Sequence, residues 1–203
     1  MRRTRRIMLF LGLTVGGVAV LAGCAWIYAS STVEQPTYQV ELSEGAIETR
    51  RYPALVVAEV VRSGARYEAV SRGFRPLAGY IFARERQGEA IAMTAPVTQR
   101  REGTGSDWRV QFIMPSEYQL SDLPEPAQGD VALSEMPPQR RAAIRFSGVA
   151  TDELIAEQEA LLRDWMAAQG LTPEGAPIYA YYNDPFTPGF LRRNEVLFDL
   201  TDG

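Results

Sequence analysis

The chain has 203 residues and a formal net charge of −4, it contains no histidine, and all 21 of its basic residues are arginine. Histidine is the usual proton shuttle near neutral pH and the commonest metal ligand, and lysine is the usual amine for Schiff-base chemistry. The composition therefore excludes a Ser-His-Asp triad and any metal site or metal cofactor that is ligated by histidine.

The first 24 residues have the three parts of a secretory signal. Met1–Arg6 carries four arginines and no acid, Ile7–Ala22 is apolar, and the sequence LAGC that ends at Cys24 resembles the lipobox of bacterial lipoproteins. A basic region, a short apolar region and a small-residue cleavage site are typical of such a signal. We therefore expect residues 1–24 to be a signal peptide with a lipobox, and Cys24 to be lipidated.

An uncleaved anchor is the alternative, because the apolar stretch continues to about residue 29, and the 23 residues from Ile7 to Ala29 are enough to cross a bilayer. The arginines before this stretch favour a cytoplasmic N-terminus. Both interpretations place the rest of the chain outside the cytoplasm, attached to a membrane of the bacterial cell envelope. Arg5-Arg6 also resembles part of a twin-arginine export signal, although an ordinary basic region accounts for the same residues.

Cys24 is the only cysteine, so the exported part has no intrachain disulfide and depends on its core for stability. Four of the 21 arginines lie in the first six residues, so residues 25–203 carry 17 arginines against 25 acids, a net charge of −8. This acidic balance argues against nucleic acid as a partner and against peripheral binding to anionic lipid. The membrane is a predicted partner only through the N-terminal lipid or anchor.

Residues 25–37 are predicted to be a tether, because Ser30–Thr37 is polar and contains a proline, and we expect this segment to be poorly ordered. Residues 38–203 form the predicted domain, which contains an internal repeat over 38–118 and 128–203. The repeat is visible in three pairs of short strings: Val40–Glu44 with Val131–Glu135, Arg50-Arg51 with Arg140-Arg141, and Ser63-Gly64 with Ser147-Gly148.

Each half of the repeat has one helical pattern set between strand-like runs. Apolar residues step by three or four in 65–82 and 151–169, which is typical of amphipathic helices. They alternate in 109–114, 143–146 and 195–200, which is typical of strands with one buried face. We predict an α+β fold of duplicated β-β-α-β-β units that form a distorted antiparallel β-barrel with two helices, related by a pseudo-twofold axis.

Five stretches resemble, in order and spacing, the signature of the SOUL haem-binding protein family. They are Phe74–Phe82, Ile91–Val97, Phe112–Tyr118, Tyr182–Pro185 and Leu191–Val196. The resemblance covers about residues 38–200. It implies a duplicated barrel-like domain that binds haem or a related porphyrin, as a non-obligatory cofactor, in a largely apolar groove beside the first helix.

Carried over by position, the resemblance implies a tetrapyrrole groove lined by side chains of that helix and of two neighbouring strands. They are Phe74, Leu77, Ala78, Ile81, Met93 and Met114. Plain core packing is the alternative for each of them, because an amphipathic helix over alternating strands buries these side chains with or without a ligand.

Three arginines beside the groove, Arg72, Arg75 and Arg84, are candidates to pair with the propionates of a bound haem, although a solvated helix face also explains them. Some members of the family have been proposed to ligate iron through histidine, and this chain has none. The resemblance therefore implies that haem is held by apolar burial without histidine ligation, which leaves a methionine or a tyrosine as the candidate iron ligand.

No pair of acids is singled out by its spacing for acid–base catalysis, and we expect a binding protein for a small hydrophobic ligand rather than an enzyme. Three alternatives stay open. The domain binds a different hydrophobic small molecule, it is an enzyme that uses a glutamate or a tyrosine in the groove, or it is a ligand-free scaffold of the envelope.

Overall fold

The computed structural model describes residues 33–84, 86–127 and 129–201. Residues from Glu34 onward belong to one compact unit. The predicted signal or anchor, with the lipidation site Cys24, lies outside the described residues. Among the helices that the structure does describe, none combines the length and the apolar character needed to cross a bilayer.

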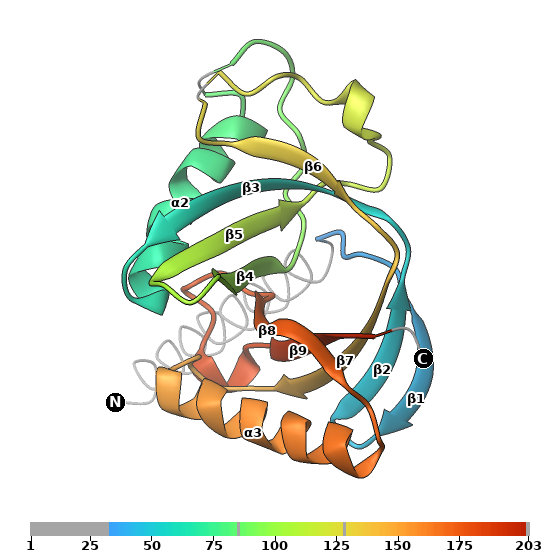
Figure 1. Cartoon of the computed structure of the whole chain (residues 1–203). Coiled ribbons are helices and arrows are strands. Elements are labelled where there is room, and N and C mark those ends of the chain that lie inside the picture. Colours follow the sequence, from blue (N-terminus) through green and yellow to red (C-terminus); the bar gives the residue numbers. More distant parts are fainter. Residues whose placement is uncertain (1–32, 85, 128, 202–203) are drawn as a thin grey trace, which may run out of the picture. The chain divides into compact units, whose positions relative to one another are not determined.

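Within the described ranges, nine strands form one antiparallel sheet in the order β1-β2-β7-β9-β8-β4-β5-β3-β6 (Figure 1). The strands are β1 (Gln39–Glu44), β2 (Ile47–Tyr52), β3 (Leu55–Ser63), β4 (Val97–Glu102), β5 (Asp107–Ile113), β6 (Ala132–Met136), β7 (Gln139–Phe146), β8 (Pro173–Tyr181) and β9 (Asn194–Leu200). The helices are α2 (Arg66–Ile81) and α3 (Asp152–Ala168), with short 3-10 turns η1 (Leu120–Asp122) and η2 (Gly189–Leu191).

The sheet is strongly curled without closing completely, which is compatible with the predicted distorted barrel (Figure 1). Strand β1 pairs with β2, strand β6 pairs with β3, and in the described part of the chain these two strands are the ends of the sheet. All six residues of β1 are exposed, so its free edge faces solvent instead of closing on β6. The α+β class and the duplicated order of elements are confirmed.

The two repeats are β2-β3-α2-β4-β5 and β6-β7-α3-β8-β9. The first strand of each repeat pairs with a strand of the other repeat. Strand β2 pairs with β7 of the second repeat, and β6 pairs with β3 of the first. Two of the three echoes in the sequence are therefore not equivalent positions. Val40–Glu44 lies on β1, outside the repeat, and Arg50 lies on the first strand of its repeat whereas Arg141 lies on the second strand of the other. The exchange explains why the repeats form a single unit.

The glycine before each helix is an equivalent position. Gly64 and Gly148 have φ angles of 117° and 118°, a region that side chains rarely adopt. The carbonyl of Gly64 accepts a hydrogen bond from the indole of Trp108 at 3.0 Å, and the carbonyl of Gly148 accepts one from the amide of Asn194, also at 3.0 Å. In each repeat the last strand thus fixes the turn that starts the helix.

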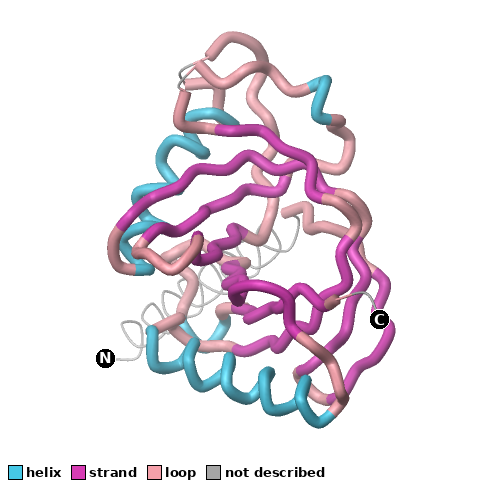
Figure 2. Tube along the Cα trace, viewed as in Figure 1, coloured by secondary structure: helices cyan, strands magenta, loops and turns pink. Residues whose placement is uncertain are grey.

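Each helix covers one half of the sheet on its outer side (Figure 2). Helix α2 packs on β3 and β5, and it approaches them closely at Gly73, where an added Cβ would lie 2.8 Å from a methyl of Val110. Helix α3 packs Ile155, Leu162 and Met166 onto β7 and β9. These two apolar cores lie between a helix and the sheet, and a third apolar cluster, which includes Tyr52, Ala143 and Leu197, lies on the opposite face.

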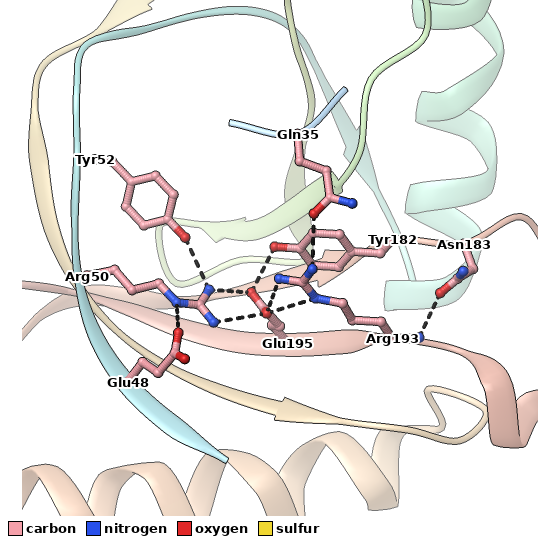
Figure 3. A network of polar contacts seen from close by, with 8 residues as sticks. All are labelled: Gln35, Glu48, Arg50, Tyr52, Tyr182, Asn183, Arg193 and Glu195. Carbon is pink, nitrogen blue, oxygen red and sulfur yellow. Dashed lines mark hydrogen bonds and ion pairs between the residues drawn. The ribbon is translucent and has the colours of Figure 1, made fainter. Parts of the chain in front are cut away.

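The opposite face of the sheet carries buried ion pairs. Arg141 donates from Nε to Asp199 at 2.7 Å, and Arg100 also pairs with Asp199. Arg50 pairs with Glu195 nearby (Figure 3). Alternation along a strand sends successive side chains to opposite faces, so the same strands that supply the α3 core supply this polar layer.

Candidate functional site

The residues predicted to line an apolar groove do lie together, but most of them fill the core under α2. Leu77, Ala78, Ile81 and Met114 are buried in that core, and Met93 is half-buried at its margin. Phe74 is 40% exposed, and its ring lies edge-on to Phe112 with 5.2 Å between the ring centroids. A flat ligand bound here would have to displace well-packed side chains.

The three arginines predicted to meet propionates, Arg72, Arg75 and Arg84, are exposed on α2 and just after it. Arg72 donates to the carbonyl of Ser63, and the guanidinium of Arg84 lies 5.7 Å from the ring centroid of Phe82. None of the three arginines pairs with a carboxylate among the residues that the structure describes.

A pocket of about 600 Å3 lies away from α2, beside the strand ends of the second repeat. Its walls come from the turn between β1 and β2, from β2, from the end of β7 and from the loop between β8 and β9. The lining residues are Tyr38, Gly45, Ala46, Glu48, Arg50, Arg145, Phe146, Ser147, Phe190, Leu191, Arg192 and Arg193.

The pocket is cationic in a chain that is otherwise acidic. Four arginines line it and one acid, Glu48, does so. Arg50 and Arg193 are paired with carboxylates, whereas Arg145 and Arg192 have no carboxylate partner within the described ranges. Aromatic and aliphatic side chains complete the walls. This combination suits a ligand that has both an apolar surface and negative charge.

Two of the lining residues, Arg50 and Arg193, belong to a buried network centred on Glu195 (Figure 3). The carboxylate of Glu195 accepts from Arg50 at 2.8 and 3.1 Å, from Arg193 at 2.7 Å and from the hydroxyl of Tyr182 at 2.8 Å. The guanidinium of Arg193 also stacks over Tyr182, 3.8 Å from the ring centroid. These contacts fix both arginines rigidly, so their positions do not depend on a ligand.

The network shifts the pKa values of its members. Burial alone would raise the pKa of Glu195, but the hydrogen bonds and charges of Arg50 and Arg193 outweigh it and hold that pKa below its ordinary value. Burial and the nearby charge of Glu195 raise the pKa of Tyr182. Glu195 is therefore a permanent anion that orients arginines, and it is not poised to transfer protons near neutral pH.

The folded unit begins beside this network, a few residues earlier than the predicted start at residue 38. The backbone carbonyl of Glu34 accepts from the amide of Ala95 at 2.9 Å, and its carboxylate accepts from the amide of Ser116 at 2.8 Å. The side chain of Gln35 accepts from Arg193 at 3.0 Å (Figure 3). The last part of the predicted tether is thus attached to the domain by hydrogen bonds.

Reasoning from sequence missed the pocket but not all of its residues. Leu191–Val196 is one of the stretches that carry the family resemblance, and Arg192 and Arg193 belong to it. Arg50 and Arg145 gave no such signal, because an arginine in a strand is most often solvated. Their convergence depends on strand pairing between the two repeats, which spacing along the chain does not reveal.

Comparison with solved structures shows the same fold in distant proteins. The C-terminal domain of EcmrR superimposes with a TM-score of 0.60 at 12% identity, covering 82% of this chain and 99% of that one. A protein described as a hydrolase from Listeria innocua gives a TM-score of 0.55 at 11% identity, covering 79% and 94%. At these identities the similarity establishes the architecture alone.

Comparison with known sequences is more specific. Heme-binding protein 2 of Mus musculus is 29% identical over 175 residues, covering 81% of this chain and 84% of the relative. Heme-binding protein 2 of Homo sapiens is 30% identical over 185 residues, covering 86% and 89%. The family model described as SOUL heme-binding protein matches residues 33–199. The chain is therefore a member of the SOUL haem-binding protein family.

Proposed function

We propose that this protein binds haem or a related tetrapyrrole, and that it does so in the arginine-lined pocket between β2, the end of β7 and the β8–β9 loop. Membership of the family supports the ligand class. The observation that carries the choice of site is a pair of arginines, Arg145 and Arg192, which line a pocket of about 600 Å3 without carboxylate partners in the described part of the chain. A volume of this size is ordinary for a small-molecule site.

The lining residues fit the chemistry of a porphyrin with two propionates. Arg145 and Arg192 supply positive charge that pairs with the carboxylates of the propionates. The rings of Tyr38, Phe146 and Phe190 supply flat apolar surface that contacts the macrocycle. The pocket is more polar than the apolar groove predicted beside α2. Charge therefore contributes to binding along with contact area, and we expect affinity for anionic porphyrins over neutral ones.

The iron of haem has no imidazole available in this chain, which lacks histidine. Among the lining residues Tyr38 carries a phenol, the type of ligand that some haem proteins use. We propose that binding depends on the macrocycle and its propionates and not on the iron. Haem and metal-free protoporphyrin should then bind with similar affinity, and Tyr38→Phe should leave both affinities unchanged.

Spectroscopic titration of the full chain with haem and protoporphyrin tests the proposal. The side chain of Arg145 makes no hydrogen bond within the described residues, and its backbone amide, which donates to the carbonyl of Ala46 at 2.9 Å, is kept in any substitution. Arg145→Glu therefore tests charge without disturbing the fold. An exposed ion pair contributes up to about 1 kcal/mol, and reversal should weaken binding by about fivefold or more. Arg75→Glu, which changes another exposed arginine, one on α2, is the matched control and should have no effect.

Two results would overturn the proposal. A loss of affinity in Phe74→Arg with none in Arg145→Glu would move the ligand to α2, where the family resemblance first suggested it. A large preference for haem that disappears in Tyr38→Phe would show that iron ligation dominates.

A further inference from the structure

The loop between β8 and β9 displays two phenylalanines to solvent. Phe186 is 89% exposed and Phe190 is 78% exposed, and Leu191 and Val149 beside them are also exposed. Gly189 holds the β8–β9 loop against Val149. Its carbonyl accepts a hydrogen bond from the amide of Gly148 at 3.0 Å, and a Cβ added at Gly189 would lie 3.1 Å from a methyl of Val149. We call these four exposed apolar residues, Val149, Phe186, Phe190 and Leu191, the loop patch. Phe190 and Leu191 also line the pocket, so the patch borders the proposed ligand site, whereas Val149 and Phe186 do not line it.

The loop that carries the patch is braced by its own hydrogen bonds. The carboxylate of Asp184 accepts from the amides of Phe186 and Thr187 at 2.8 and 3.1 Å and from the Thr187 hydroxyl at 2.9 Å. Arg192 donates to the carbonyls of Thr187 and Pro185 at 2.7 and 2.6 Å. The exposure of Phe186 is therefore a fixed feature of a well-bonded loop, and exposed apolar patches of this kind mark interaction surfaces.

The first described residues of the chain, which follow the predicted membrane attachment, lie beside this loop. Gln35 is held by Arg193, the residue that follows Arg192. Gln35 lies six positions after Ala29, the end of the predicted anchor, so the chain between them spans at most about 20 Å. If Cys24 is lipidated instead, the span is at most about 40 Å. Either attachment is short enough for the β8–β9 loop to reach the bilayer.

We infer that the loop patch inserts into the surface of the bilayer to which the N-terminal segment attaches the protein. Phenylalanine and leucine side chains bury into the boundary between headgroups and acyl chains, and arginines beside them keep their charge at the headgroups. The net charge of −8 on residues 25–203 opposes attraction to anionic lipid. Insertion is thus apolar and works in a zwitterionic bilayer.

The test uses the full chain in phosphatidylcholine nanodiscs. Phe186→Trp places a fluorescent probe in the loop patch, and Tyr67→Trp is the matched control, because Tyr67 is 72% exposed but lies on α2. Emission of the unaltered chain, which has three tryptophans, is subtracted. We expect the tryptophan added by Phe186→Trp to shift to the blue and to be quenched by lipids brominated at shallow acyl positions, about 5–10 Å below the headgroups.

The control tryptophan on α2 should be neither shifted nor quenched. Absence of quenching in Phe186→Trp would overturn the inference, and so would equal quenching of both variants, since the contact would then not be specific to the loop patch. Phe186 does not line the pocket. Porphyrin affinity should therefore be unchanged in Phe186→Trp, and failure of membrane insertion would leave the proposed ligand site untouched.

Discussion

The guanidinium of Arg50 and the carboxylate of Glu195 form a bidentate ion pair that joins the two repeats through the polar face of the sheet. Nη1 lies 2.8 Å from Oε2, Nη2 lies 3.1 Å from Oε1, and the two side chains are 2% and 0% exposed. Arg50 is on β2 and Glu195 is on β9, with β7 between them. The pair therefore connects strands that share no backbone hydrogen bonds.

Removing the charge of Glu195 should be strongly destabilising. In Glu195→Gln the guanidinium of Arg193 loses its counter-ion, and the buried guanidinium of Arg50 keeps only Glu48, at 2.7 Å. Breaking a buried pair in this way costs about 3–5 kcal/mol. Urea unfolding would measure the difference in the free energy of unfolding. Glu41→Gln is the matched control, because Glu41 also meets two arginines, Arg51 and Arg140, but on an exposed strand. It should cost at most about 1 kcal/mol, and equal costs in the two variants would contradict the role given to burial.

Stability should fall in acid. The ordinary pKa values are 4.5 for Glu195 and 3.8 for Asp199, and in the folded protein both pKa values are lowered; burial opposes this, but the neighbouring arginines outweigh it. The unfolded chain then binds protons before the folded chain does, so the free energy of unfolding decreases as the pH falls below about 4.5 towards the lower folded values. Urea unfolding across about pH 5 to 3 measures this decrease, and Glu195→Gln should show a smaller one. A stability that is flat over this range would disprove the assignment.

Helix α2 should tolerate no side chain at Gly73. A Cβ there would lie 2.8 Å from one methyl of Val110 and 3.2 Å from one of Val60. Overpacking of this kind costs about 1–3 kcal/mol, which exceeds the gain of up to about 1 kcal/mol in helix propensity when alanine replaces glycine. Gly73→Ala should lower the melting temperature. Gly105→Ala, where an added Cβ meets open space, should not change it, and a stabilised Gly73→Ala would show that the helix can move outward at no cost.

The two helices begin differently, and the difference predicts opposite effects of substitution. Thr151 caps α3 by accepting a hydrogen bond from the amide of Leu154 at 3.2 Å, whereas Ala65 at the start of α2 offers no such cap. Thr151→Ala should cost about 1 kcal/mol, and Ala65→Ser should stabilise the protein by up to about the same amount. Thermal unfolding would measure both, and a destabilised Ala65→Ser would mean that its extended backbone cannot direct the hydroxyl to the helix.

Porphyrin binding should weaken as salt is raised. The screening length falls from about 10 Å at 0.1 M salt to about 3 Å at 1 M, and in the proposed site Arg145 and Arg192 attract the ligand by charge. Titrations at the two concentrations would measure the change in dissociation constant, with Arg145→Glu showing a smaller dependence than the unaltered chain. Affinity that is independent of salt would favour purely apolar burial beside α2.

Local patterns in the sequence predicted the two helices and three of the strands. Steps of three and four placed the helices at 65–82 and 151–169, within three residues of α2 and α3. Alternation placed the strands near β5, β7 and β9. The open sheet could not be predicted in this way, because closure depends on which edges meet. Strand β1 has an exposed edge, and nothing in its six residues shows whether a partner is present.

The sequence by itself excluded histidine-dependent catalysis and histidine-ligated metals. It also determined the family to which the protein belongs and the order of its repeated elements. These properties depend on composition and on neighbours along the chain. Only the tertiary structure decided that Leu77 and Ile81 fill a core, and that Arg50 meets Glu195 across 145 positions of sequence. The physical reason is that burial and ion pairing depend on distances in space, and the exchange of β2 and β6 between the repeats sets those distances.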